Sequence, residues 1–322
     1  MAKNHKPALG IDLGGTNMQI GVVSPDFKLL GSAKRKTKAA EGTSAVLDRI
    51  VEGALEAIAN AKLSIRDIAC LGLGAPGAVD PDQGVVLEAV NLRWKNTPAA
   101  ELLAKKLGVP VFLDNDVNVA VYGENRLGAG KGSRHMLGVW VGTGIGGGLI
   151  LNGELFYGHF MTAGEIGHMI ALPNNPPGHR SLEHNCSRTA VVDQIVRLIK
   201  SNRKSRITEL CNGDFDDIKS KMVAKAFEDG DEVTREVVLH AAELLGIEIA
   251  GVVTLLSLER VVLGGGLTEA IGKPFVDLVD KSVKNFAFPD RCKNVKIVAS
   301  QLEDNAGVYG AAMIALERLE RK

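Results

Sequence analysis

The chain has 322 residues and a mass of 34.2 kDa, a length typical of about two domains. Its 38 Lys and Arg balance its 38 Asp and Glu, which argues against a general nucleic-acid binder, because such proteins gain affinity by neutralising phosphates. Apolar runs such as residues 250–258 are far shorter than the roughly 20 residues of a membrane-spanning helix, and no signal peptide is visible. We therefore expect a cytoplasmic protein with neither nucleic acid nor membrane as a partner.

The first half of the chain alternates strand and helix patterns. Residues 9–23 predict strand, glycine turn and strand, and a helix follows at about 44–61 with its apolar positions on one side. A strand near 68–73 leads to a Gly/Pro turn at 74–77, and a helix at about 98–107 precedes a strand at 109–113. Residues 114–118 then run into another helix. This alternation predicts an α/β architecture.

Residues 137–151 form a second glycine hairpin. Laid over the first with Leu9 on Leu137, it matches Gly14 with Gly142. Two copies of one supersecondary unit predict two related halves that face one another. The alternative is a chance likeness of two glycine hairpins.

The remaining elements carry less chemistry. Residues 201–232 are polar and include at least one amphipathic helix, a long apolar helix follows at about 233–258, and a strand at 260–263 leads into three glycines. The last helix, from about residue 306, is rich in Gly and Ala, which predicts close packing against another element. The four cysteines (Cys70, Cys186, Cys211 and Cys292) form no C-x-x-C pair, so we expect buried, unpaired thiols.

Three glycine turns follow strands, at residues 14–16, 142–144 and 264–266. Without a Cβ, their backbone N–H groups can approach a polyphosphate closely, and the hydroxyls of Thr16 and Thr143 add donors. One such turn alone could be a plain hairpin, but three favour a nucleotide cradle. Residues 142–147 match G-x-G-x-x-G, yet they lead into a returning strand and not a helix, which excludes the dinucleotide fingerprint.

Two aspartates at strand ends are candidates for chemistry. A carboxylate at Asp12, beside the first glycine turn, would repel phosphate unless Mg²⁺ lay between them, and a turn cap is the alternative. Asp116 precedes a helix, so its plain role would be an N-cap. Its functional role would be a general base that takes the proton of a hydroxyl attacking the γ-phosphate of a nucleotide. The helix dipole would keep that carboxylate ionised.

Further polar residues lie in glycine-rich turns and could bind a polyol. Carboxylates and amides that each grip neighbouring hydroxyls are what a sugar site needs, and a lone His is more often structural than functional. The candidates are Asn91, Asn115, Glu165, His168 and Glu183.

Taken together, these motifs resemble the ROK (repressor, open reading frame, kinase) family, and within it the bacterial glucokinases. The resemblance covers nearly the whole chain and rests on residues 12–16, 74–77, 115–118, 142–148, 164–168, 182–183 and 264–266. It implies the actin-like, hexokinase-type ATPase fold, with two α/β domains and an interdomain cleft. The smaller domain would take residues 1–118 and 305–322, the larger domain 119–304, and the protein would be a homodimer.

The resemblance also implies a role for each site residue. Asp116 matches the catalytic base, and the sugar contacts would be Gly77, Asn91, Asn115, Asp116, Glu165, His168 and Glu183. ATP with Mg²⁺ near Asp12 would bind at Asp12, Gly14, Gly15, Thr16, Asn17, Thr143, Gly144, Gly264, Gly265 and Gly266.

One departure concerns structural zinc. Family members usually bind it through the histidine that matches His168 and three cysteines, but Asn174, Pro176 and Ser181 stand at those positions here. Structural zinc needs four N or S ligands, so we expect none. His179, His184 and Cys186 could supply a rebuilt site, and the changed loop leaves the sugar preference open.

The resulting hypothesis is an ATP-dependent hexose kinase, favouring the 6-hydroxyl of glucose. N-acetylglucosamine, N-acetylmannosamine or fructose as the sugar, and polyphosphate as the donor, are alternatives. A sugar-responsive repressor would carry a helix-turn-helix domain ahead of Asp12, where few residues precede it here, and a catalytically silent sugar-binding protein is disfavoured by Asp116.

Overall fold

The computed structural model describes residues 6–321, and these residues form two compact units. The first unit holds the chain up to Lys131, the segment Tyr157–Ala163 and the residues from Asp304 onward. The second unit holds Gly132–Phe156 and Gly164–Glu303. The first unit thus extends beyond residue 118, the limit that the family resemblance implies, because helix α3 (Asp116–Leu127) packs along helix α11 (Ala306–Glu320).

The first unit is built on a five-stranded sheet with strand order β3-β2-β1-β4-β8. The first three strands pair antiparallel, and β4 and β8 continue parallel to β1. Their bounds are β1 Ala8–Leu13, β2 Asn17–Val23, β3 Leu29–Lys36, β4 Leu71–Ala75 and β8 Val111–Asn115. Alternate residues point to opposite faces, so Leu9 and Ile11 join the core under α1 (Thr43–Asn60) and α2 (Ala99–Leu107). Ala8 joins the core under α11 on the other face.

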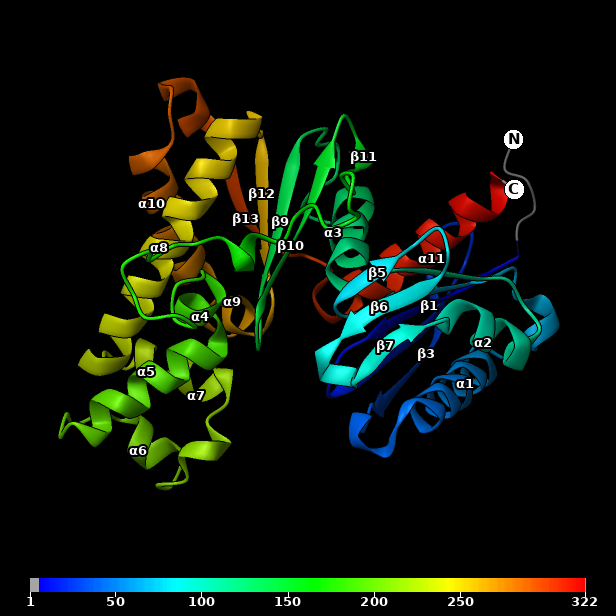
Figure 1. The fold of residues 1–322 in the computed structure, drawn as a ribbon, viewed down its shortest axis with the longest axis horizontal. Helices are drawn as coiled ribbons and strands as arrows, with labels where there is room; N and C mark the ends of the chain where they lie inside the picture. The colour runs from blue at the N-terminus through cyan, green and yellow to red at the C-terminus, as the bar shows by residue number, and fades with distance from the viewer. Residues whose placement is uncertain (1–5, 322) are drawn as a thin grey trace. The chain divides into compact units, whose positions relative to one another are not determined.

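Helix α11 lies unusually close to the sheet (Figure 1). A Cβ built on Gly10 of β1 would lie 1.9 Å from the carbonyl oxygen of Val308, and one on Gly72 of β4 would lie 1.9 Å from that of Ala311. On the helix itself, a Cβ on Gly310 would lie 1.7 Å from the carbonyl oxygen of Val119 in α3. The predicted close packing of this small-residue helix is confirmed.

A small antiparallel sheet, β5-β6-β7, follows β4 in the first unit. Its strands are β5 Ala78–Asp80, β6 Val85–Ala89 and β7 Trp94–Thr97. The patterns in the sequence predict none of these strands. The turns around this sheet carry Gly77 and Asn91, two of the candidate sugar contacts.

The sheet of the second unit has strand order β11-β10-β9-β12-β13. Here β9–β10–β11 pair antiparallel, and β12 and β13 continue parallel to β9. The bounds are β9 Met136–Val141, β10 Ile145–Leu151, β11 Glu154–Leu155, β12 Arg260–Gly264 and β13 Lys296–Ala299. Both sheets therefore have the same order and strand directions. This confirms that the two glycine hairpins begin related structures and that a chance likeness is the wrong explanation.

Seven helices accompany this second sheet in the described part of the chain. They are α4 Glu183–Cys186, α5 Arg188–Lys200, α6 Ile207–Leu210, α7 Ser220–Glu228, α8 Glu232–Leu256, α9 Gly266–Ile271 and α10 Lys273–Phe286. By length and composition α8 alone, among the helices described, could cross a membrane, but 56% of its most apolar window is buried. It packs against α5 and α10, as a core helix of a folded unit does.

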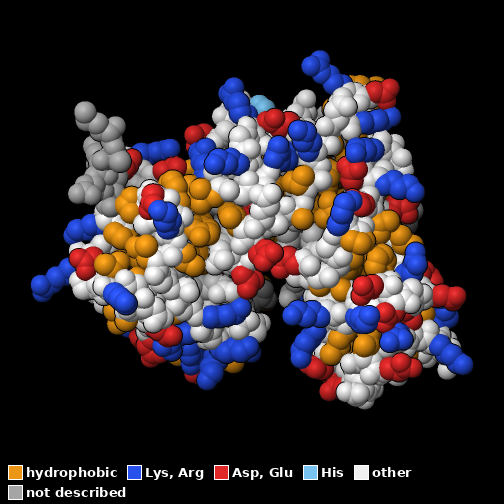
Figure 2. Space-filling model, turned by 180° about the vertical axis from the view of Figure 1, so that it is seen from behind, with side chains coloured by type: hydrophobic (Ala, Val, Ile, Leu, Met, Phe, Trp, Pro, Cys, Tyr) orange, Lys and Arg blue, Asp and Glu red, His pale blue; other side chains and the backbone are white. Residues whose placement is uncertain are grey.

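Short 3₁₀ turns connect several of these elements, at Ala39–Glu41, Ile65–Asp67, Val90–Leu92, Ile166–His168, Phe215–Asp217, Asp290–Asn294 and Glu303–Asn305. All four cysteines are free thiols, and three of them are buried while Cys292 is partly exposed. Acidic and basic side chains are interspersed over the face of each unit seen in Figure 2, in keeping with the formal net charge of zero.

Candidate active site

The first glycine turn joins β1 to β2 and is hydrogen-bonded by Thr37, a residue that no sequence motif marks. The Thr37 hydroxyl donates to the carbonyl oxygen of Gly14 at 2.6 Å, and the Thr37 backbone N–H donates to that of Thr16 at 2.9 Å. A Cβ on Gly15 would lie 3.2 Å from the Asn91 Cβ, so Asn91 lies directly beside the turn. Thr16 itself is exposed and Asn17 begins β2.

Asp12 lies on β1 just before this turn and is only partly exposed. A Cβ on Gly307, in the first turn of α11, would lie 2.6 Å from its Oδ2, so the carboxylate packs against that helix end. The pKa of Asp12 is raised to about 7, mainly by burial, and the negative charges of Asp116 and Asp304 contribute to the same rise. A divalent cation at this point would relieve the repulsion among the three carboxylates, which fits the predicted magnesium side of the site.

The strand β8 hands the chain to α3 through Asn115 and Asp116. The Asn115 Oδ1 accepts from the backbone N–H groups of Val117 at 2.9 Å and Asn118 at 3.1 Å, and its Nδ2 donates to the Gly77 carbonyl at 3.1 Å. Asn115 is therefore the N-cap, and the alternative that Asp116 caps the helix is wrong. Asp116 is the first helical residue, where the positive end of the helix dipole favours an ionised carboxylate.

These residues of the first unit lie at the carboxyl ends of the parallel strands of its sheet. Asp12 is in register with Gly74 on β4, and Gly74 with Asp114 on β8. A Cβ on Gly74 would lie 3.3 Å from the Asp116 Cα, so the backbone of β4 closely approaches the start of α3. The carboxyl ends of parallel strands are the usual place for ligand sites in α/β sheets. We call the residues gathered here the first-unit cluster: Asp12, Gly14, Gly15, Gly77, Asn91, Asn115 and Asp116.

The second glycine turn joins β9 to β10 and is tied to the start of α5. The Arg188 backbone N–H donates to the Gly142 carbonyl at 2.9 Å, and the Thr189 hydroxyl donates to the Thr143 carbonyl, also at 2.9 Å. Thr143 is exposed. Thr189 carries no motif that would mark it in the sequence, because its partner is a backbone atom.

Glu183, expected as a sugar contact, also contacts this turn. Its Oε2 accepts the backbone N–H of Ile145 at 2.8 Å, and a Cβ on Gly144 would lie only 2.2 Å from the same oxygen. The absence of a side chain at residue 144 thus makes room for the carboxylate. One side chain therefore joins the predicted phosphate turn to the predicted sugar contacts.

Glu165 and His168 lie nearby on a 3₁₀ turn, with Glu165 Oε2 3.9 Å from His168 Nε2. Burial raises the pKa of Glu165, the neighbouring His168 opposes the rise, and the charge of Glu183 adds to it. The two carboxylates are thus close enough to repel one another. The second-unit cluster consists of Thr143, Gly144, Glu165, His168 and Glu183.

The third glycine turn differs from the other two because it opens a helix. Gly264 ends β12, Gly265 has a φ of +86° as the N-cap of α9, and Gly266 begins the helix. A Cβ on Gly264 would lie 2.6 Å from the ring of Trp140, and one on Gly265 would lie 2.7 Å from the Val141 nitrogen. Trp140, which the sequence analysis did not select, therefore forms the floor of this turn.

The loop in which the family resemblance places zinc ligands is held by hydrogen bonds. Asn185 Nδ2 donates to the carbonyl oxygens of His179 at 3.0 Å and Ser181 at 2.8 Å, and Arg180 Nε donates to that of Asn175 at 2.6 Å. Between residues 6 and 321, no group of three or more His, Cys, Asp or Glu gathers in a way that could hold a metal ion. The expectation that zinc is absent stays a prediction.

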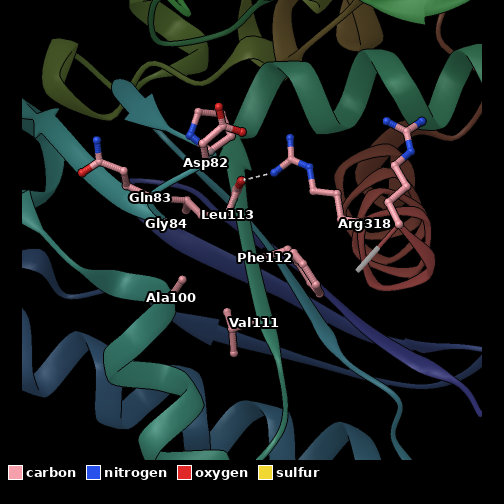
Figure 3. Close-up of a pocket in the computed structure, with 10 residues that line it drawn as sticks. Asp82, Gln83, Gly84, Ala100, Val111, Phe112, Leu113 and Arg318 are labelled. Carbon is pink, nitrogen blue, oxygen red and sulfur yellow. Dashed lines mark hydrogen bonds between the residues drawn. The ribbon is translucent and has the colours of Figure 1, made fainter.

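A cavity of about 390 Å³ in the first unit opens beside β8 (Figure 3). The turn after β5, residues 111–113 of β8, and Arg318 and Arg321 of the last helix line it. None of the predicted site residues lines this cavity. Arg318 reaches from α11 to the Leu113 carbonyl, which lies next to Asp114 on β8.

Comparison with known proteins shows the family to which this chain belongs. The family model described as ROK family matches residues 8–318. The chain belongs to the ROK family. It is 33% identical to a protein named glucokinase from Thermotoga maritima, over 97% of this chain and 98% of that one. Its fold is accordingly the hexokinase-type ATPase fold, with two α/β units, as expected.

Two further relatives of this ROK protein are named for different functions, one as a kinase and one as a repressor. The structure of a ROK family glucokinase from Streptomyces griseus in complex with glucose and AMPPNP has a TM-score of 0.85 and 28% identity, covering 97% of this chain and 99% of that one. A xylose repressor from Caldicellulosiruptor bescii is 28% identical over 97% of this chain and 78% of the repressor. The family therefore includes both kinases and regulators among the relatives of this chain.

Proposed function

We propose that this ROK protein is an ATP-dependent hexose kinase, and most simply a glucokinase that phosphorylates the 6-hydroxyl of glucose. The observation that carries the proposal is the position of Asp116. It is the first residue of α3, near enough to Asp12 for the two charges to interact, in a chain 33% identical to a named glucokinase. A silent binding protein would have no need of an ionisable side chain at that place.

The sugar would be held by amides of the first-unit cluster and by acids of the second. The Asn115 amide is held in one orientation by its capping bond and by its bond to the Gly77 carbonyl. It would therefore bind a sugar hydroxyl only in a matching position. Glu165, His168 and Glu183 would bind the remaining hydroxyls, since carboxylates and imidazoles accept from them.

The phosphoryl group would move by in-line attack. The sugar oxygen forms a bond to the γ-phosphorus as the bond from that phosphorus to the bridging oxygen of ADP breaks, and Asp116 accepts the hydroxyl proton. Positioning contributes most of the rate, because such transfers need little covalent assistance from the protein. The proton then leaves Asp116 to solvent.

The nucleotide would be held by backbone N–H groups at the glycine turns, with Thr16, Asn17 and Thr143 as side-chain donors. Gly264, Gly265 and Gly266 would bind the adenosine. Asp12 is the residue that would hold Mg²⁺, which when bound would neutralise phosphate charge. The raised pKa of Asp12 fits a carboxylate that has a cation as its partner when the substrates are bound.

We further propose a cytoplasmic location and small-molecule partners limited to hexose and ATP. A homodimer is proposed on the family resemblance alone. Polyphosphate as donor, or N-acetylglucosamine, N-acetylmannosamine or fructose as acceptor, are the alternatives that a substrate panel separates.

The test is ADP release from Mg-ATP across a hexose panel, run beside Asp116→Asn. We expect this nearly isosteric change to lower kcat by about 10²- to 10⁴-fold, the usual contribution of a general base, while circular dichroism and Tm show an intact fold. Asp48→Asn, an exposed carboxylate on α1 paired with Lys106, is the matched control and should keep full activity. A folded Asp116→Asn protein with normal turnover would refute the base assignment.

The regulator remains the second candidate because of the similarity to a named xylose repressor. A sugar that raises Tm in the absence of any ADP release would favour sugar binding without catalysis. ADP release with at least one hexose decides for the kinase.

A further inference from the structure

The residue before the Asn115–Asp116 pair is an aspartate that solvent hardly reaches. Asp114 is 1% exposed. Its Oδ1 accepts the backbone N–H of Asn115 at 2.9 Å and the Asn118 amide at 3.4 Å. Its Oδ2 accepts from Arg318 and from the Tyr157 hydroxyl, both at 2.7 Å. Both oxygens are therefore fully engaged, and two of the donors belong to the junction of β8 and α3.

Arg318 of α11 connects the same junction to the last helix. Its Nη1 donates to the Leu113 carbonyl at 2.8 Å (Figure 3), and its Nη2 donates to both Asp114 and the Tyr157 hydroxyl, the latter at 2.9 Å. The guanidinium thus holds the backbone of β8 and the side chain that follows it. Such a forked, charged contact fixes direction as well as distance.

Tyr157 reaches this cluster from a separate segment. Residues Tyr157–Ala163 belong to the first unit, although the chain on both sides of them belongs to the second. Burial and the nearby Asp114 charge raise the pKa of Tyr157, so its hydroxyl stays protonated and donates a hydrogen bond to Asp114. Burial raises the pKa of Asp114 as well, and the positive charge of Arg318 opposes that rise.

Stability alone is a weak reason for this arrangement. A buried ion pair loses in desolvation much of what it gains in attraction, and apolar residues of similar volume often serve as well. What apolar residues lack is direction, because only hydrogen bonds fix the backbone N–H of Asn115 and the amide of Asn118 in one orientation. A displacement of a reacting group by about 1 Å can cost 10²-fold in rate.

We propose that Asp114, Arg318 and Tyr157 are positioning residues that hold the start of α3, and through it the Asp116 carboxylate, in the geometry for attack. Asp114 is shielded from solvent, and Arg318 and Tyr157 direct their donors to it, so the three would act through Asn115 and Asp116. The proposal rests on the proposed kinase function. It assigns a role in the reaction to side chains that are 43 and 204 positions away from Asp114 in the chain.

The test compares two tyrosines that each donate to a carboxylate in the same unit. Tyr157→Phe removes the bond to Asp114. Tyr122→Phe removes a bond from α3 to Glu317 of α11, the neighbour of Arg318, and does not touch Asp114. Both hydroxyl bonds are part-buried, so we expect a similar fall in Tm of a few degrees for the two variants, in line with about one hydrogen bond.

Only Tyr157→Phe should change the reaction. We expect its kcat to fall about 10-fold, with KM for hexose and for ATP within about twofold of the parent, as for an interaction used in the transition state. Tyr122→Phe should keep kcat. Arg318→Lys retains a positive charge for Asp114 but lacks the planar fork that reaches both the Leu113 carbonyl and Asp114, so it should also lower kcat. It avoids the unpaired buried carboxylate of an alanine variant.

The proposal is overturned if Tyr157→Phe keeps the parent kcat, or if both tyrosine variants lose kcat equally. A loss that appears only in KM would also overturn it, since that would indicate a binding role. A parent protein that phosphorylates no hexose at all refutes the kinase function itself, and the positioning role with it. That outcome is distinguishable from the others because it needs no variant.

Discussion

The pH dependence of stability provides a direct test of the charge cluster around Asp12. Burial, with help from Asp116 and Asp304, raises the pKa of Asp12 from 3.8 to about 7 in the folded protein. In the unfolded chain the group ionises near its ordinary value. The folded state therefore binds this proton more tightly than the unfolded state does between about pH 4 and pH 7. By linkage, its contribution to stability is fully present below about pH 4 and is lost as the pH rises through 7.

The size of the effect follows from the shift. Each pKa unit corresponds to about 1.4 kcal/mol, so a rise from 3.8 to about 7 gives an upper bound of about 4 kcal/mol. Asp12 retains some contact with solvent, and hydration of the carboxylate reduces the figure to about 2 to 4 kcal/mol. That is a large part of the stability of an ordinary domain.

Asp12→Asn isolates this contribution, because the amide keeps the shape of the side chain but does not titrate. The assay is denaturant unfolding of both proteins between pH 4 and pH 8 at constant ionic strength, with the difference taken at each pH so that other carboxylates cancel. We expect no difference near pH 4 and a variant more stable than the parent by about 2 to 4 kcal/mol at pH 8. Mg²⁺ should stabilise the parent at pH 8 and leave the variant unchanged.

A second variant checks the cause of the shift. Asp116→Asn removes one of the charges that raise the pKa of Asp12, so the parent's loss of stability should move to lower pH in this background. A difference between Asp12→Asn and parent that stays constant from pH 4 to pH 8 would refute the reasoning. It would mean that the Asp12 carboxylate is ionised throughout.

Four other predictions concern the turn, the helix cap, the packing and the metal requirement. Gly144→Ala places a Cβ 2.2 Å from Glu183 Oε2 and should displace it, raising KM for hexose about 10-fold by loss of charge-assisted bonds; steady-state kinetics with an unchanged KM would contradict this. Asn115→Ala should lower the free energy of unfolding by about 1 kcal/mol through the lost cap and raise KM for hexose, and denaturant unfolding with kinetics measures both. Gly72→Ala places a Cβ 1.9 Å from the Ala311 carbonyl oxygen. Because this oxygen belongs to the backbone of α11 and cannot move aside, we expect the free energy of unfolding to fall by at least about 3 kcal/mol. An unchanged denaturation midpoint would disprove the close packing. Removal of metals by a chelator, followed by Mg²⁺ alone, should restore full activity, whereas a need for zinc would show that a zinc site exists.

Most strands of the two main sheets could be predicted because their signals are local, but β3, β11 and β13 were not predicted. Alternating apolar residues and glycine turns mark β1, β2, β9 and β10 within a few positions, and the repeat of the hairpin predicted that the two halves are related. The small sheet β5-β6-β7 could not be predicted. Its strands have three to five residues and carry polar side chains such as Glu88 and Lys95, so their pairing depends on neighbours and not on pattern.

The start of α3 shows where local reasoning about the site ends. Asp114, Asn115, Asp116 and Asn118 are all residue types that favour a helix N-terminus, and nothing in their order selects one. Contacts from distant parts of the chain bear on the choice. Arg318 engages Asp114 from 204 positions away, and Asn115 pairs with Ala75 of β4, so β8 extends through Asn115 and the helix begins after it.

The loop without cysteines raises the question of what orients Glu183. This residue begins α4, which is a single turn ending at Cys186, too short to hold its own direction. The turn is fixed at one point by Asn185, buried and bonded to the carbonyl oxygens of His179 and Ser181. It is fixed at a second point by Glu183 itself, through the backbone N–H of Ile145. In the proposed site a sugar hydroxyl would donate to the same carboxylate, so the position in which Asn185 and Ile145 hold Glu183 would determine where that hydroxyl binds. Hexose preference in this protein should therefore depend on Asn185 as well as on the residues that touch the sugar.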